Sequence, residues 1–449
     1  MSSDVSNEIN QPTHGLTIWS TSVFIVGEIA GSGVLALPKA VDNSGWIGLV
    51  LIVVCAFASA YTGAILGRAW LIVQSRNPQY QSHVVDPYPI IGEQAFGKFG
   101  RYLVSFSINF TLFGVSVVFL ILAAENLQDL ISHATKDVSF CYFIIILAVV
   151  LMPVVCLGTP KDFWPIAVGA TLATGLACIL LLARIIQDKD KHGETVEHSK
   201  QEFTSFFTAF GTIVFAFGGH PAFPTFQADM RNKADFKWAV LLGYMIVLAM
   251  YLPTSTSAYF IYGSTVKDNI LLTTTDGPIT YIVQTLITLH LLFGFVIVIN
   301  PFCQEIESKF GVPKEFTWKR CVARPLMVLC ALFVAESIPR FGAILALVGG
   351  STTTLLAYIC PSVFYLKLCR KPRDDTAPFV RDEFIEDEAS LQKLDTDFIE
   401  VPLWEKILNY EIIFIGLIAG IASTASAIKD IAGPSSFRVP CYVDPSKPA

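Results

Sequence analysis

The chain has few charges and lacks the motifs of a soluble enzyme. Asp, Glu, Lys and Arg make up 15% of its 449 residues, and 53% of the residues are hydrophobic. An average soluble domain has about 25% charged residues. No phosphate-binding loop, metal-ligand cluster or nucleophile motif occurs. We therefore expect a polytopic membrane protein that is not an enzyme and binds no metal.

A cleavable signal peptide and a disulfide framework are also missing. The first sixteen residues are polar, lack a basic region and lead into an apolar run too long for a signal peptide. That run is expected to anchor the protein. Several of the ten cysteines lie in apolar runs, where a free thiol behaves as a small hydrophobe. Cys141 and Cys441 could face the oxidising side together and form one bridge.

Apolar runs long enough to span a bilayer, about twenty residues each, recur along the chain. We count about eleven: 17–40, 46–74, 100–126, 140–157, 162–186, 205–229, 237–262, 278–303, 321–338, 341–368 and 408–430. Lys and Arg gather in alternate short loops, and Arg320 and Arg324 are counted in one of them. This bias predicts a cytosolic N-terminus and a C-terminus on the cell exterior or in an organelle lumen.

The first apolar segment is interrupted at its centre. Gly31-Ser32-Gly33 follow Glu28 closely, and Pro38 lies near the end of the segment. Each glycine weakens a helix by roughly 1 kcal/mol relative to alanine. A carboxylate at membrane depth costs at least a few kcal/mol and tends to be functional. The pattern predicts a broken helix; close helix packing by small residues is the alternative.

The sixth segment is interrupted in a similar way. Gly218-Gly219 precede His220-Pro221, and a proline removes a backbone donor and disfavours helix at the residue before it. Broken helices in corresponding positions of two halves indicate an inverted-repeat transporter with a site near the midplane. The second break therefore favours unwinding over simple packing at the first.

Two motifs resemble the amino acid/auxin permease family. Residues 31–38, followed by Gly45-Trp46, are similar to the first helix of that family. Residues 217–224 are similar to its sixth segment, as in vesicular and vacuolar amino acid transporters. The resemblance implies a LeuT-type fold and amino acid transport, commonly coupled to protons and sometimes to sodium. Glu28 departs from several family members, which have a neutral residue shortly before the Gly-x-Gly.

The predicted fold is an all-α membrane protein with a LeuT-type 5+5 inverted repeat and one further helix. The parts are a cytosolic tail 1–16, a first five-helix repeat 17–186, an outer loop 187–204, a second repeat 205–368, a cytosolic acidic loop 369–406, an eleventh helix 407–430 and an outer or lumenal tail 431–449.

The predicted substrate site lies between the two breaks. Backbone groups freed there are tolerated only where they line a cavity or meet a ligand, and helix ends carry partial charges. N–H groups near residues 31–33 would bind the carboxylate of an amino acid, and carbonyls near residues 217–219 its ammonium. The predicted contacts are Ala30, Gly31, Ser32, Gly33, Asn109, Phe217, Gly218 and Gly219.

Four residues are predicted to couple transport to an ion: Glu28, His220, Thr288 and His290. Glu28 can alternate its protonation as the cavity opens to each side, or it can be a structural group paired with a helix end. His220 suits a proton relay, or it hydrogen-bonds the unwound backbone. LeuT-type sodium sites often use paired hydroxyls in the eighth helix. Thr288 has no second hydroxyl beside it, which favours protons over sodium.

The sequence thus predicts a secondary active transporter of small neutral amino acids that works by alternating access. A proton gradient is the expected driving force, with sodium as the alternative; no cofactor and no nucleic acid partner are expected. The membrane is the plasma membrane or a vesicular or endolysosomal one. The alternative function is an amino-acid sensor that signals with little flux through the acidic run 381–388. An intramembrane enzyme is disfavoured, because His220 and His290 have no partner nucleophile or metal cluster in the sequence.

Overall fold

The structure is a computed structural model that describes residues 15–81, 84, 86–132, 138–157, 164–191, 196–313, 315–370, 400–433 and 442–443. Within these ranges the regular structure is helical, apart from a single backbone bridge between Leu16 and Met230. The tail 1–14, the acidic run 381–388 and Cys441 lie outside the described residues.

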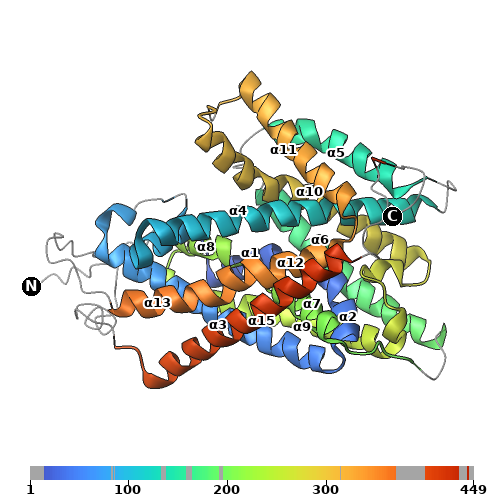
Figure 1. Cartoon of the computed structure of the whole chain (residues 1–449), viewed down its shortest axis with the longest axis horizontal. Helices are drawn as coiled ribbons and strands as arrows, with labels where there is room; N and C mark the ends of the chain where they lie inside the picture. The colour runs from blue at the N-terminus through green and yellow to red at the C-terminus, as the bar shows by residue number, and fades with distance from the viewer. Residues whose placement is uncertain are drawn as a thin grey trace, which may run out of the picture.

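The helices follow the predicted apolar segments. They are α1 (Ile18–Ile29), α2 (Gly33–Ser44), α3 (Ile47–Arg76), α4 (Pro87–Ser132), α5 (Phe140–Cys156), α6 (Trp164–Gln187), α7 (Phe203–Ala216), α8 (Phe223–Ala228), α9 (Phe236–Tyr262), α10 (Pro278–Lys309), α11 (Trp318–Ser337), α12 (Phe341–Val348), α13 (Cys360–Arg370) and α15 (Leu403–Ala432). Figure 1 shows the long α4 running along the molecule, with α5 and α11 on one side and α3, α13 and α15 on the other.

The prediction of an all-α protein that crosses a membrane several times is confirmed. By length and apolar character, the described residues contain eight candidate spans, or nine if the bent pair α1–α2 is one span. Two shorter or more polar helices, α5 and α11, make up the difference from the expected eleven. α5 has 17 residues, and α11 contains buried Arg320 and Arg324. The prediction that these two arginines are loop charges is therefore wrong, because both lie within a helix.

The third span extends well beyond the predicted 100–126. α4 begins at Pro87 and continues through its polar end to Ser132, with a kink at Phe96 and Gly97. Gly97 has a φ of +65°, a conformation in which a side chain is strained. Residues 87–99, which precede the predicted segment, therefore form the first part of α4, and the helix turns at Gly97.

Both predicted breaks are present. α1 and α2 are bent by 60° relative to each other, and residues 30–32 separate them. α7 ends at Ala216, and a short 3₁₀ turn (His220–Ala222) leads into α8. α2 packs against α7, and α1 and α2 both pack against α9. These contacts bring the two breaks to the centre of the bundle.

Candidate functional site

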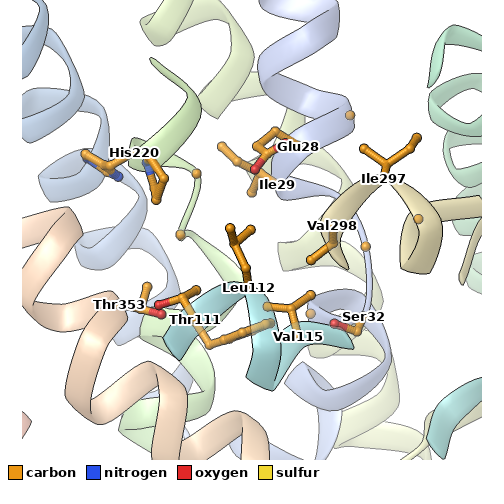
Figure 2. Close-up of a pocket in the computed structure, with 18 of the residues that line it drawn as sticks. Glu28, Ile29, Ser32, Thr111, Leu112, Val115, His220, Ile297, Val298 and Thr353 are labelled. Carbon is orange, nitrogen blue, oxygen red and sulfur yellow. The ribbon is translucent and has the colours of Figure 1, made fainter. Parts of the chain in front are cut away.

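A cavity of about 400 Å³ lies where the two breaks face each other. Its wall includes residues 27–29 and 31–33 at the first break and residues 218–221 at the second. α4, α6, α10 and the span of α12 and α13 complete it, and most of the lining side chains are apolar. Figure 2 shows Glu28 of α1, Ser32 of the first break, Val115 of α4 and Thr353 of the span of α12 and α13 around the same space. The cavity lies between the two breaks, where the two sequence motifs predict a substrate site.

The first break exposes both kinds of backbone group. α1 ends at Ile29, and its last carbonyls have no N–H donor within the helix. α2 begins at Gly33, and its first N–H groups have no acceptor within the helix. Gly31 donates to the Ile29 carbonyl at 3.0 Å, which folds the chain back on itself between the two helices. A helix N-terminus carries partial positive charge, so this end suits an anionic group.

Two tyrosines of α9 hold the carbonyl ends of both broken helices. The hydroxyl of Tyr251 donates to the Ile29 carbonyl at 2.9 Å, and that of Tyr244 donates to the Phe217 carbonyl at 2.9 Å. The two tyrosines are seven residues apart, about two helical turns, and therefore lie on one face of α9. Both side chains are buried. One helix thus positions both breaks.

We expect Tyr251→Phe to slow transport roughly tenfold while the protein still folds. The ring keeps its packing, but the Ile29 carbonyl loses one of its two recorded donors and keeps only the N–H of Gly31, at a cost of about 0.5–1.5 kcal/mol. Tyr259→Phe on the same helix is the matched control, because that ring stacks on His198 at 4.1 Å and has no recorded hydroxyl hydrogen bond among the described residues. Initial uptake rates in proteoliposomes measure the effect. Equal rates in the two variants would show that Tyr251 does not position the break.

Glu28 faces the cavity. Its side chain is exposed there, whereas the neighbouring Ile25, Val26 and Ile29 are buried in the bundle. Among the described residues, no donor or cationic side chain is recorded with its carboxylate. The interpretation of Glu28 as a structural group paired with a helix end or a polar side chain finds no partner here.

His220 also lines the cavity, but its ring is fully buried. Nε2 lies 3.0 Å from the hydroxyl of Thr62 on α3, and the ring packs against Phe223 with centroids 4.8 Å apart. The sequence left open a proton relay or a bond to unwound backbone. The recorded partner is instead a side chain on a neighbouring helix, which attaches the second break to α3.

His290 on α10 lies beside the first break. Its Nδ1 is 2.9 Å from the hydroxyl of Thr174 on α6, and its Nε2 would lie 3.5 Å from a Cβ atom at Gly31. The imidazole lines the cavity. α6, α10 and the break between α1 and α2 therefore meet at this histidine.

Some of the other predicted residues line the cavity and some do not. Gly31, Ser32, Gly33, Gly218 and Gly219 line it.

Ala30 and Phe217 lie in the breaks, but their side chains are buried and are not part of the wall. Asn109 lines a separate hollow between α4 and α10, and its amide donates to the Ser105 carbonyl at 2.7 Å. Thr288 is buried and outside the cavity wall. The structure does not bring Asn109 and Thr288 together with the other candidates.

Parts of the wall were missed by the sequence analysis. Thr353 belongs to a π-helical stretch, Gly349–Thr353, which a second one, Leu355–Ile359, follows within the span of α12 and α13. π-helical turns are rare and frequent at functional sites. Thr352 pairs with Thr111 of α4 at 2.7 Å. The run Gly349-Gly350-Ser351-Thr352-Thr353, small and polar within an apolar segment, was the available signal.

The described residues contain no group of three or more His, Cys, Asp or Glu side chains that could hold a metal ion. The titratable side chains on the cavity wall are the carboxylate of Glu28 and the imidazoles of His220 and His290.

Residues 14–384 match the family described as "Transmembrane amino acid transporter protein". The chain belongs to this family. The transporter is 25% identical over 433 residues to "Amino acid transporter AVT1J" of Arabidopsis thaliana, with 93% of this chain and 92% of the relative covered. It is 24% identical to "Amino acid transporter AVT1B" of the same organism, with 77% of this chain and 64% of the relative covered.

The fold is similar to that of MhsT, a LeuT-type transporter crystallised with L-phenylalanine. The TM-score is 0.53 at 13% identity, with 92% of this chain and 99% of MhsT covered. The likeness shows the fold, and with the family it confirms the expected LeuT-type architecture and amino acid transport. Membership of a transporter family confirms the expectation that the protein is not an enzyme.

Proposed function

We propose that the transporter carries small neutral amino acids together with protons, by alternating access around the two breaks. The observation that supports this most is the cavity between the breaks, with the carboxylate of Glu28 facing it. The cavity size falls within the range of pockets for small ligands, about 300–1,000 Å³. The mainly apolar wall suits an uncharged side chain.

The two breaks offer complementary ends to a zwitterion. In the proposed pose, the substrate carboxylate meets the N–H groups at the start of α2, near Gly31 to Gly33, where the helix dipole is positive. The ammonium meets the carbonyl end of α7, near Gly218 and Gly219. Tyr244 binds the Phe217 carbonyl and so holds this end of α7 beside the cavity-lining Gly218 and Gly219.

Proton coupling is assigned to Glu28, with His290 as a second candidate. Glu28 sits at the C-terminal end of α1, where the negative end of the helix dipole disfavours a charged carboxylate. Sodium remains the alternative. The proton is favoured because His290, a titratable group, lines the cavity, whereas Thr288, the hydroxyl considered for sodium, does not.

Alternating access would act through contacts at both ends of the broken helices. On one side, Asp42 of α2 accepts from the hydroxyl of Ser199 at 2.6 Å and from Lys39 at 3.0 Å. On the other, Leu16 before α1 donates to the Asp229 carbonyl at 2.8 Å and accepts from Arg231 at 3.0 Å. We propose that these two sets of contacts open in alternation.

We further propose that the N-terminus is cytosolic, in a plasma membrane or a vesicular or endolysosomal membrane. Cys141, at the start of α5, is disulfide-bonded; its partner expected from the sequence, Cys441, lies outside the described residues. Disulfides persist mainly on the oxidising side of a membrane. This supports the assignment of that end of α5 to the exterior or lumen.

The test is uptake of a panel of labelled amino acids into proteoliposomes of the purified transporter, with imposed pH or sodium gradients. We expect small neutral amino acids to accumulate when the pH gradient is present. Binding without gradient-driven uptake of any member would favour the sensor alternative and overturn the proposal.

Glu28→Gln is expected to abolish proton-driven accumulation. The amide keeps the shape of the side chain but cannot exchange a proton, so uptake should stop at equal concentrations on the two sides. Accumulation of labelled alanine with and without a pH gradient measures this. Accumulation equal to that of the unchanged protein would show that Glu28 does not couple the proton.

A further inference from the structure

The carboxylate of Glu28 is a charge that the cavity wall does not balance. Neither Lys nor Arg occurs among the residues that line the cavity. The other titratable groups on the wall are His220 from the second break and His290 from α10. Each imidazole has a threonine hydroxyl as its recorded partner, and neither is recorded in an ion pair with Glu28.

A bound amino acid does not correct this imbalance by itself. Its own carboxylate and ammonium cancel, so the occupied cavity would carry one negative charge from Glu28. A carboxylate that faces a mainly apolar cavity is less well solvated than one in bulk water, so a bound proton or a paired cation stabilises it. A proton meets this need when the substrate is neutral. The ammonium or guanidinium of a basic side chain meets it equally well.

The cavity also suits the rest of a basic side chain. Leu112 and Val115 of α4 and Val298 of α10 form part of its wall, and Figure 2 shows them around the same space as Glu28. The methylene stem of a lysine packs along such apolar surfaces while its head reaches a polar group. Thr111 and Thr353 add hydroxyl groups to the wall.

We propose that Glu28 is an exchangeable cation site, so that the transporter carries neutral amino acids with a proton and cationic amino acids without one. The inference rests on the proposed function, because it concerns the same cavity and the same transport cycle. The charge of Glu28 is neutralised by a proton when the substrate is neutral and by the substrate's side chain when it is cationic. In both cases one net positive charge crosses the membrane with each substrate.

The experiment compares labelled L-alanine and L-lysine in proteoliposomes, with the pH gradient and the membrane potential imposed separately. Alanine uptake should rise with the pH gradient or with the membrane potential. It should also acidify the inside of the proteoliposomes, as read by a trapped pH-sensitive dye. Lysine uptake should rise with the potential only and leave the dye unchanged.

Three variants link this behaviour to the carboxylate. Glu28→Gln should remove the effect of the pH gradient on alanine and raise the half-saturating lysine concentration about tenfold, because the paired charge is lost. Glu28→Asp should retain both modes. Glu411→Gln, at an exposed position of α15 outside the cavity, should behave as the unchanged protein.

The outcomes separate this inference from the proposed function. Alanine uptake driven by protons, with no lysine uptake, would overturn the inference alone. Lysine uptake that carries a proton, that needs sodium, or that is unchanged in Glu28→Gln would do the same. No uptake of either substrate would overturn the proposed function itself.

Discussion

Replacing Gly33 with Ala is expected to abolish uptake of every substrate. A Cβ atom at Gly33 would lie 2.8 Å from the Cβ of Ala216 and 2.9 Å from its Cα, distances that force the backbones apart. Gly33 is the first residue of α2, and Ala216 is the last residue of α7. The added methyl group would therefore separate the two breaks from each other. Overpacking of this kind costs roughly 1–3 kcal/mol, and here the strain falls on the cavity wall.

The matched control for this prediction is Gly175→Ala on α6. Among the described residues beyond its own helical turn, none has an atom within 4 Å of a methyl group added at Gly175, so this variant tests glycine replacement in a membrane helix without a clash. Its uptake should equal that of the unchanged protein. Adding Ala216→Gly to Gly33→Ala should restore part of the uptake, since it removes one of the two clashing atoms. Full uptake by Gly33→Ala alone would show that the breaks do not need this close contact.

Replacing Arg324 with Met is expected to destabilise the fold by about 3–5 kcal/mol, because it leaves a buried carboxylate without its main partner. Arg324 is 1% exposed and forms two hydrogen bonds with Glu307 of α10, at 2.7 and 3.1 Å. It also donates to Asn300 Oδ1 at 3.0 Å and to the Val155 carbonyl at 2.7 Å. One side chain thus joins α11 to α10 and α5.

Thermal unfolding in detergent and the yield of monodisperse protein measure this loss. The unfolding temperature of Arg324→Lys should fall between those of the unchanged protein and Arg324→Met, since an ammonium keeps the charge but cannot form the paired bonds of a guanidinium. Lys309→Met is the matched control. Lys309 lies 3.1 Å from Glu305 four residues away but is 62% exposed, and such pairs contribute about 0–1 kcal/mol. An unfolding temperature of Arg324→Met equal to that of the control would contradict the structural role.

The breaks were predictable because their causes are local. Gly31-Ser32-Gly33 and Gly218-Gly219-His220-Pro221 weaken a helix through backbone freedom and a missing donor, and these effects depend on adjacent residues only. Glu28 stood out for the same reason, as a carboxylate inside an apolar run. The structure keeps these features and brings them into one cavity.

The features that the sequence does not reveal depend on how each helix is rotated and on hydrogen-bonded pairs that are far apart in the chain. The sequence predicts Asn109 as a substrate contact and Thr288 as an ion-coupling hydroxyl, yet the rotation of α4 and α10 leaves both outside the cavity wall. Arg324 was counted as a loop charge, because hydropathy cannot reveal a partner 17 residues away at Glu307. Tyr244 and Tyr251 looked like ordinary aromatic residues of a membrane helix until their acceptors were known.

The sequence by itself determined the membrane class, the order of the apolar segments and the positions of both breaks, since these follow from composition and from local backbone preferences. Only the tertiary structure decided which groups share the cavity and which partner each has. A hydrogen bond such as Tyr251 to Ile29 joins residues 222 positions apart, and no local property of either one specifies it. For Glu28 the decisive observation was also tertiary: its carboxylate faces the cavity, and none of the lining residues carries a lysine or arginine charge to balance it.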